Sequence, residues 1–188
     1  MEDWRDSIMT RCVACGGPMK TKREKAYRYA ECGLPNVILE NAVDVATCTK
    51  CGETYTGMPA IEGLHRAIAA GLIRKKRRLA PEEIRFLRKS LGWSGVDFAK
   101  RMGATPETVS RWENSKAPMG AQADRLLRLL VAREAPITEY SVDVLAQLAA
   151  DDAPATPARV EMTKGAHGWR FVPGPALVAA GEREDVTR

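Results

Sequence analysis

The sequence predicts an α+β fold in which a small β-rich N-terminal domain precedes an all-α domain of about five helices. All five cysteines lie between Arg11 and Gly57, among short runs of Tyr, Val, Ile and Thr that favour strands. From Ile61 to Arg133 the apolar residues recur at three-to-four spacing, which is typical of helices with one buried face. The two patterns do not overlap along the chain, and this segregation is typical of the α+β class.

Charge is distributed unevenly along the 188 residues, although the formal net charge is only +5. Residues 1–73 carry nine basic and nine acidic side chains, which cancel. Residues 74–133 carry fifteen basic and six acidic side chains, and residues 134–188 carry five basic and nine acidic ones. The central excess predicts a surface that meets phosphate groups. The chain has no run of about 20 apolar residues and no apolar signal-peptide core, so we expect a cytoplasmic protein that does not enter a membrane.

The first domain is expected over residues 1–59, followed by a connecting helix and basic linker over 60–78. Its predicted strands are 26–30, 37–39, 43–45 and 54–56, joined by turns at 33–36 and 40–41. Pro59 precedes a helical pattern that ends near Gly71 and whose apolar positions are Ile61, Leu64, Ile68 and Leu72.

The helical domain is expected over residues 79–150. Pro81 suits a first helical turn, and Gly92 suits the stop of that helix. Ser94 and Asp97 have the spacing of a capping box that opens the next helix. Further helices are predicted from Thr105–Pro106, over the leucine-rich stretch 121–133, and over 142–150. Residues 151–188 have the composition of a Pro/Ala linker and tail, in which 160–162 and 169–172 can pair as a hairpin.

Four cysteines form two C-x-x-C knuckles, Cys12 with Cys15 and Cys48 with Cys51. Two knuckles supply four thiolates, which fill the coordination shell of one zinc ion and leave no position for substrate. We therefore expect one structural Zn²⁺ ion per chain. Disulfides and a redox dithiol are the alternatives, but an odd cysteine count and a second matching knuckle favour the metal. Cys32 remains as a small core residue or free thiol.

The stretch from Ser94 to Glu113 has the spacing of a helix-turn-helix. Ala99 is small enough for two helices to cross closely, and Gly103 permits an unusual turn. Apolar side chains that would close the wedge between the helices are Phe98, Met102, Val109 and Trp112. Inside the most basic third of the chain, this pattern predicts a DNA-binding unit.

The second helix of that unit presents Glu107, Thr108 and Arg111 opposite its buried face. Arg111 suits guanine, Glu107 suits the cytosine amino group, and Thr108 suits a thymine methyl or a phosphate. The alternative is an i,i+4 surface pair between Glu107 and Arg111. The expected phosphate contacts are Ser94, Lys100, Arg101 and Lys116. The basic run 74–78 reads equally well as a phosphate contact and as a solvated linker.

The order of these motifs resembles the MqsA-type antitoxins, which join a YgiT-type zinc finger to an Xre/Cro-type helix-turn-helix. Two knuckles, a connecting helix, the segment from Leu79 to Arg88 and the segment Ser110–Asn114 carry the resemblance, over about residues 11–133. It implies an antitoxin and transcriptional repressor of a type II toxin-antitoxin system. The zinc domain would bind a cognate toxin, commonly an mRNA-cleaving ribonuclease, and the helical domain would dimerise on a palindromic operator.

The resemblance also implies roles for individual residues. Cys12, Cys15, Cys48 and Cys51 fall on the family's zinc ligands, and Arg111 falls on a base-reading arginine. Glu107 stands where an asparagine reads bases in the best-known member of the family. The operator of this chain should therefore differ in sequence from the operator of that member. We expect the homodimer to form through the last two predicted helices of the helical domain, over 121–133 and 142–150. The alternative function is a stand-alone zinc-containing Xre-type regulator without a toxin. An enzyme is not expected, because the chain shows no nucleophile–base set and no glycine-rich phosphate loop.

Overall fold

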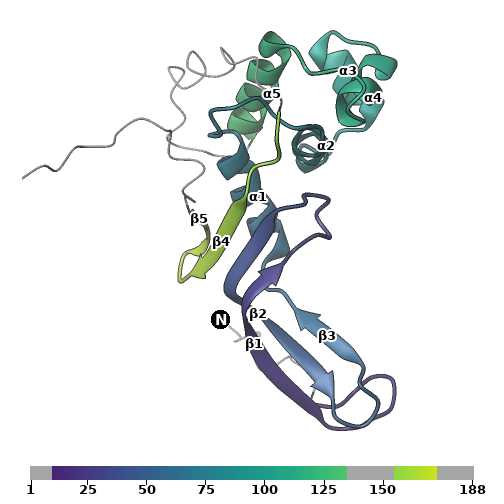
Figure 1. Ribbon diagram of the computed structural model, residues 1–188, viewed down its shortest axis with the longest axis vertical. Coiled ribbons are helices and arrows are strands. Elements are labelled where there is room, and N and C mark those ends of the chain that lie inside the picture. Colours follow the sequence, from purple (N-terminus) through teal and green to yellow (C-terminus); the bar gives the residue numbers. More distant parts are fainter. Residues whose placement is uncertain (1–9, 135–154, 173–188) are drawn as a thin grey trace, which may run out of the picture.

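A computed structural model describes residues 10–134 and 155–172 of the chain, which form one mixed sheet and a group of helices (Figure 1). The strands are β1 (Met19–Arg28), β2 (Val37–Cys48), β3 (Thr54–Gly57), β4 (Val160–Gly165) and β5 (Gly168–Val172). The helices are α1 (Ile61–Leu72), α2 (Pro81–Ser90), α3 (Gly95–Met102), α4 (Pro106–Glu113) and α5 (Ala121–Glu134). The predicted α+β class is confirmed. None of the described helices is both long and apolar enough to cross a bilayer.

Strand β2 is the centre of the sheet. It pairs antiparallel with β1 along one edge, from Met19 opposite Cys48 to Arg28 opposite Ile38. Its other edge is shared, because β3 pairs antiparallel with residues 44–47 and β4 pairs parallel with residues 37–40. β5 follows β4 as an antiparallel neighbour. The end of β2 nearest Cys48 is therefore held between β1 and β3.

The expected turn at residues 40–41 is wrong, because β2 continues through it as a single strand of 12 residues. Asn41 has a φ of 49°, and the register with β1 shifts between Glu24 and Ala26. One extra residue on β2 is accommodated there as a β-bulge. A Glu-Asn pair between apolar residues interrupts the strand pattern in the same way as a turn does, so the local sequence did not distinguish the two.

The hairpin expected within residues 160–172 is confirmed, but it joins the N-terminal sheet instead of lying in a separate tail. Val160 pairs with Val37, more than 120 residues earlier in the sequence. The Trp169 indole N–H donates to the Pro59 carbonyl at 3.1 Å. Gly71 faces the Phe171 ring so closely that a Cβ there would lie 2.6 Å from Cδ2 of Phe171. The hairpin thus covers α1 as well as extending the sheet.

The helices begin and end close to the expected positions. The capping box of α3 forms, with the Asp97 N–H donating to Ser94 Oγ at 3.1 Å, and the Thr108 N–H donates to Thr105 Oγ1 at the start of α4. Ala80 has no side-chain oxygen to cap α2, and the carboxylate of Glu83 accepts its N–H instead at 2.7 Å. The helix expected over 142–150 lies outside the described residues.

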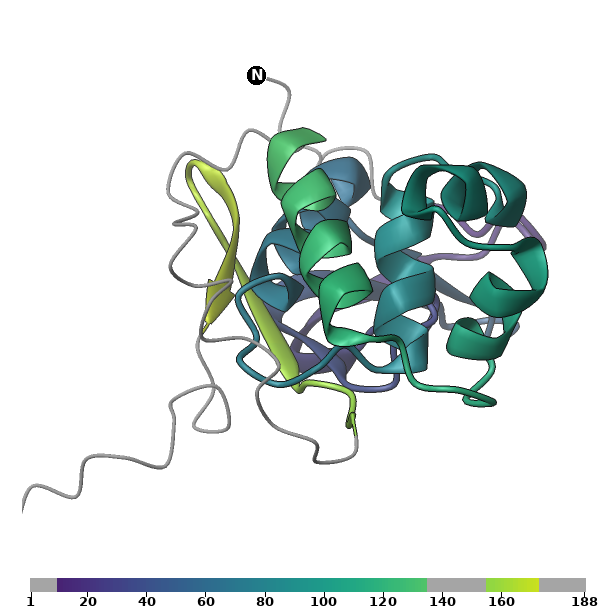
Figure 2. The same cartoon turned by 90° about the horizontal axis from the view of Figure 1, so that it is seen from above.

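One continuous core joins the sheet to the helices. It includes Val37 and Leu39 of β2, Leu64 and Ile68 of α1, and Leu127 of α5. The leucine-rich helix α5 leaves Leu126 and Leu129 exposed. Its buried residues are Asp124, Leu127, Arg128 and Val131. Seen from above, α5 lies beside α2 over the sheet (Figure 2).

Candidate metal centre and nucleic-acid interface

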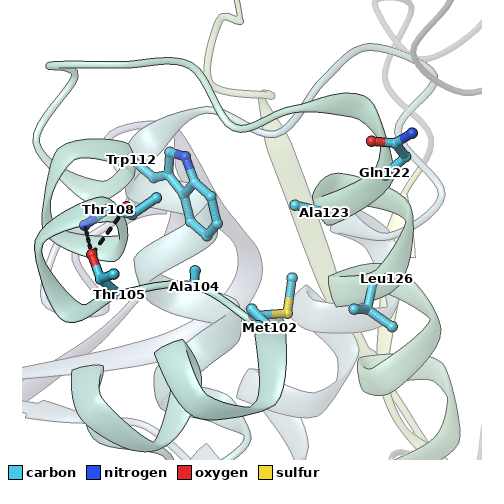
Figure 3. Close-up of a pocket in the computed structure, with 9 residues that line it drawn as sticks. Met102, Ala104, Thr105, Thr108, Trp112, Gln122, Ala123 and Leu126 are labelled. Carbon is cyan, nitrogen blue, oxygen red and sulfur yellow. Dashed lines mark hydrogen bonds between the residues drawn. The ribbon is translucent and has the colours of Figure 1, made fainter.

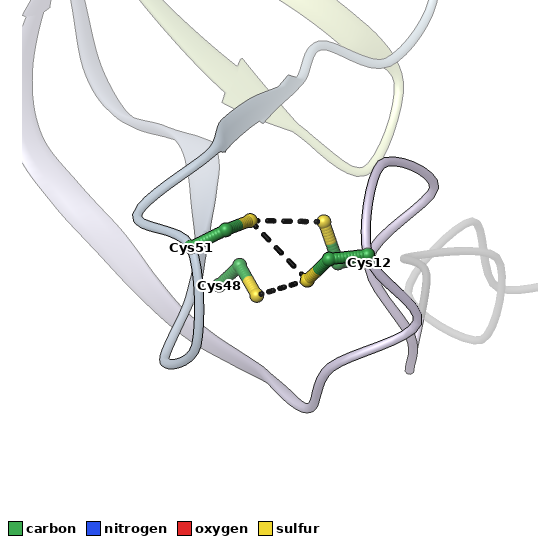
Figure 4. A group of neighbouring side chains, drawn as sticks. Cys12, Cys48 and Cys51 are labelled. Carbon is green, nitrogen blue, oxygen red and sulfur yellow. Dashed lines mark hydrogen bonds between the residues drawn. The ribbon is translucent and has the colours of Figure 1, made fainter.

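The four knuckle cysteines meet at the end of the sheet where β2 ends (Figure 4). Their sulfur atoms all lie within 4.8 Å of one another. Cys12 Sγ and Cys51 Sγ are 3.6 Å apart, and Cys15 Sγ lies 3.5 Å from Cys48 Sγ and 3.3 Å from Cys51 Sγ. The structure therefore brings together the four cysteines predicted as ligands. Cys32 is apart from them, with its thiol directed at the Tyr29 carbonyl at 3.4 Å.

The backbone around the knuckles explains why these sequences bring their thiols together. Gly16 and Gly52, each next after a C-x-x-C pair, have φ of 68° and 78°, a left-handed conformation that glycine adopts without steric cost. The Gly16 N–H donates to the Cys12 carbonyl and the Gly52 N–H to the Cys48 carbonyl, at 2.8 and 3.0 Å. Each knuckle is thereby closed into a tight turn that carries both sulfurs on one side.

The electrostatics of the four thiols favour a bound cation. The backbone N–H groups of Cys51 and Lys50 lower the pKa of the Cys48 thiol to about 6. The Glu53 N–H lowers the pKa of Cys51, but the thiols of Cys15 and Cys48 outweigh it and raise that pKa to about 12. One thiolate thus forms readily while its charge opposes the next. A cation at the centre of the cluster removes this repulsion.

The donor set fits a metal ion bound by four sulfurs. Thiolates at about 2.3 Å from a tetrahedral zinc ion lie about 3.8 Å from one another, and the observed separations of 3.3–3.6 Å are close to that. Cys12 and Cys48 are buried, whereas Cys51 is exposed. Four-sulfur coordination would fill the shell, so the arrangement supports a structural ion that holds the two knuckles together.

Helices α3 and α4 form the expected crossing. Phe98, Ala99 and Val109 are buried between them, and Met102 and Trp112 pack partly buried against the same core. Gly103 ends α3 with a φ of 63°, as its predicted role in the turn requires. The predicted wedge residues therefore close the unit.

A buried ion pair that the sequence did not reveal fixes α4 against α2. The Arg88 guanidinium donates to both carboxylate oxygens of Glu113, at 2.6 and 3.1 Å, and to the Trp93 carbonyl at 2.7 Å. Glu113 is only 9% exposed. Arg85 of α2 adds a bond to the Asn114 side chain at 2.9 Å. The only signal in the sequence was an acidic residue at the end of a helix, which surface positions show as often.

The three side chains predicted to contact bases lie on the first two turns of α4. Glu107 and Arg111 are exposed and Thr108 is partly buried. The described ion pairs do not include one between Glu107 and Arg111, so both side chains are available to a ligand. The Glu107 backbone N–H and the Thr105 hydroxyl lower the pKa of the Glu107 carboxyl, which keeps it ionised.

The four side chains predicted to contact phosphates are all exposed. Lys100 and Lys116 extend into solvent. The Arg101 guanidinium stacks 4.6 Å from the centre of the Trp93 ring, which restricts it to one side of α3. The Ser94 hydroxyl is engaged within the capping box, where it donates to Asp97 at 2.6 Å.

The basic run 74–78 is neither a simple phosphate contact nor a solvated linker. Arg74, Lys76 and Arg77 are exposed, but Lys75 is buried and only 4% exposed. Its amine donates to Glu83 Oε2 and to the Thr156 carbonyl, both at 2.7 Å. One member of the run thus has an internal role.

A groove of about 640 Å³ separates the α3–α4 turn from α5 (Figure 3). Met102, Trp112, Ala123 and Leu126 give it an apolar floor, while Thr105 and Thr108 line its side next to α4. Leu126 and Leu129 are 38% and 46% exposed. An apolar surface thus adjoins the helix that carries the predicted base contacts.

Comparison with known proteins identifies the helical unit. A helix-turn-helix family model matches residues 84–130, which span most of α2 and all of α3 and α4 and extend into α5. No curated protein matches the chain. The matched family supports a DNA-binding transcriptional regulator, with double-stranded DNA as a partner. The four-cysteine cluster supports a bound metal ion in the same chain.

Proposed function

We propose that the protein is a zinc-stabilised transcriptional repressor that binds a palindromic operator as a homodimer, and that it is the antitoxin of a type II toxin-antitoxin system in the cytoplasm. Glu107, Thr108 and Arg111 read bases, while Ser94, Lys100, Arg101 and Lys116 contact phosphates. The observation that carries the DNA-binding part is the exposed face of α4 within the matched helix-turn-helix unit. One Zn²⁺ ion occupies the four-cysteine cluster.

Binding to DNA from the region upstream of the gene tests this assignment. Fluorescence anisotropy should give a dissociation constant that weakens steeply as salt rises, since phosphate contacts release counterions. Arg111→Ala should weaken binding to the cognate site by about 1–3 kcal/mol, the usual value of a bidentate base contact. Arg66, exposed on α1, supplies the control variant Arg66→Ala. Equal losses for the two variants would argue against α4 as the reading helix.

The dimer is supported by the apolar groove and the exposed leucines of α5. A second copy that covers Leu126 and Leu129 would remove them from water, and its own α4 would lie near the first. This arrangement suits a palindromic site, whose half-sites are related by the same two-fold axis. Leu126→Glu with Leu129→Glu should shift the sedimentation coefficient to that of a monomer, whereas Lys89→Glu on α2 should leave it unchanged.

The antitoxin part rests on the motif order that resembles the MqsA-type family. Its toxin-binding surface would lie on the cysteine-bearing sheet. Among the described strands β1 pairs on one edge only, so its outer edge offers unpaired backbone groups to a strand of a partner. Co-expression with a neighbouring toxin-sized reading frame should yield a stable complex and suppress toxicity. A zinc-loaded repressor that binds its operator but captures no such neighbour would be a stand-alone regulator.

A further inference from the structure

The C-terminal segment 155–172 contacts both halves of the molecule. Its strands β4 and β5 extend the cysteine-bearing sheet, with Met162 opposite Leu39 of β2, and they cover α1 through Trp169 and Phe171. Figure 1 shows this segment passing from the level of the helices to the side of the sheet. Val160, Met162 and Trp169 are 1%, 0% and 8% exposed. The segment is therefore an integral part of the core.

The residues just before β4 are fastened to the first helix of the DNA-binding unit. Glu83, on the first turn of α2, is 1% exposed. Its Oε1 accepts the Ala158 N–H at 2.6 Å, and its Oε2 accepts the Lys75 amine and the Ala80 N–H, each at 2.7 Å. Lys75 also donates to the Thr156 carbonyl. One buried ion pair thus joins α2, the interdomain linker and the C-terminal segment.

The linker itself is held on its other side by α5. Arg128, which is fully buried, donates to the carbonyls of Ile73, Lys75 and Arg77, at 3.0, 2.6 and 2.8 Å. Asp124 orients this guanidinium and also accepts the Leu79 N–H at 2.7 Å. These bonds hold the linker against α5, and the Lys75–Glu83 pair holds it against α2 and the C-terminal segment.

We propose that residues 155–172 are an interdomain strap, and that Glu83 and Lys75 are positioning residues which use it to fix the cysteine-bearing sheet in one orientation relative to the recognition helix α4. The metal-bearing end of the sheet and the DNA-reading face then move as one rigid body. A partner that displaces the strap from the sheet would free the two halves to reorient. This device lies outside the helix-turn-helix unit matched at residues 84–130.

The strap is tested on the full chain, loaded with zinc and free of DNA. Backbone ¹⁵N relaxation should give one rotational correlation time for sheet and helices. Glu83→Gln and Lys75→Met, singly and together, should give two. Trypsin should cleave at the linker residues Arg74–Arg78 about tenfold faster in these variants, because proteolysis follows the population of the opened linker and losing one partner of a buried pair is costly.

The matched control is Glu161→Gln, which removes an ion pair with Arg159 inside the strap that reaches neither helix α2 nor the linker. It should leave both measurements unchanged. Zinc content and circular dichroism identify any variant that fails to fold. The wild-type measurement needs no variant: two correlation times in the native chain would overturn the proposal. So would variants that stay folded and keep one correlation time and the wild-type cleavage rate. Because no DNA is present, failure here leaves the operator-binding proposal intact.

Discussion

Replacing Arg128 with methionine should be among the most destabilising single changes in this protein. Methionine keeps an unbranched apolar stem of similar reach but removes every N–H of the guanidinium. Asp124, which is fully buried, would then keep only the Leu79 N–H as a partner, and the carbonyls of Lys75 and Arg77 would lose the Arg128 donor. Removing one member of a buried ion pair costs about 3–5 kcal/mol, and each buried carbonyl left unpaired adds about 1 kcal/mol unless water reaches it.

We therefore expect Arg128→Met to lower the free energy of unfolding by about 3–7 kcal/mol, depending on whether water reaches the two carbonyls, a large share of the roughly 5–15 kcal/mol of a typical domain. Urea denaturation followed by circular dichroism measures it, as a shift in midpoint at constant slope. Adding Asp124→Asn removes the stranded charge and should restore about 1–2 kcal/mol. Arg133→Met, exposed on the same helix, should change the free energy by less than about 0.5 kcal/mol. A loss below about 1.5 kcal/mol for Arg128→Met would refute the assignment of Arg128 as the clamp of the linker.

Three further changes probe separate features. Cys48→Ser should abolish stoichiometric zinc binding, measured by metal analysis, and lower the thermal unfolding midpoint of the sheet. The control Cys32→Ser should retain one zinc per chain. Zinc retained by Cys48→Ser would argue against four-sulfur coordination. Ala60→Gly should stabilise the chain by about 0.5–1 kcal/mol in urea denaturation, because Ala60 has a φ of 51°, a left-handed conformation that strains an alanine; a loss of stability would contradict the strain. Burial lowers the pKa of His65 below its ordinary 6.5. As the pH falls from 6.5 to the pKa of the folded state, the unfolded chain therefore binds more protons than the folded one, and the free energy of unfolding should decrease. His65→Gln should flatten that part of the plot of unfolding free energy against pH.

The features predictable from sequence are those that neighbouring residues specify. The Ser94–Asp97 capping box and the Thr105–Pro106 helix start depend on contacts within one turn. The C-x-x-C spacing likewise fixes which sulfurs can share one ion. Such short-range chemistry is written in the sequence itself. The class of the fold and the position of the helix-turn-helix followed from it.

The features that were missed depend on contacts between distant segments. Nothing near Val160 indicates that it pairs with Val37, because a short apolar strand fits many sheet edges. On α5 the sequence did not show which face is buried: Asp124 and Arg128 are buried, whereas Leu126 and Leu129 are exposed. A polar pair at i,i+4 is ordinarily a surface feature. The linker carbonyls and Asp124 together supply acceptors for the buried guanidinium of Arg128.

Burial of these ion pairs changes what the charge of the helical unit means. Within residues 74–133, the carboxylates of Glu83, Asp124 and Glu113 are buried against Lys75, Arg128 and Arg88, respectively, and Glu113 also lies 3.6 Å from Arg85. Setting these pairs aside leaves twelve basic and three acidic side chains for the remaining positions. The net excess of nine positive charges is unchanged, but most of the charged side chains that remain are basic. The buried ion pairs hold the helical unit together. The remaining basic side chains, which few acidic side chains oppose, are the groups that can release counterions from a DNA backbone.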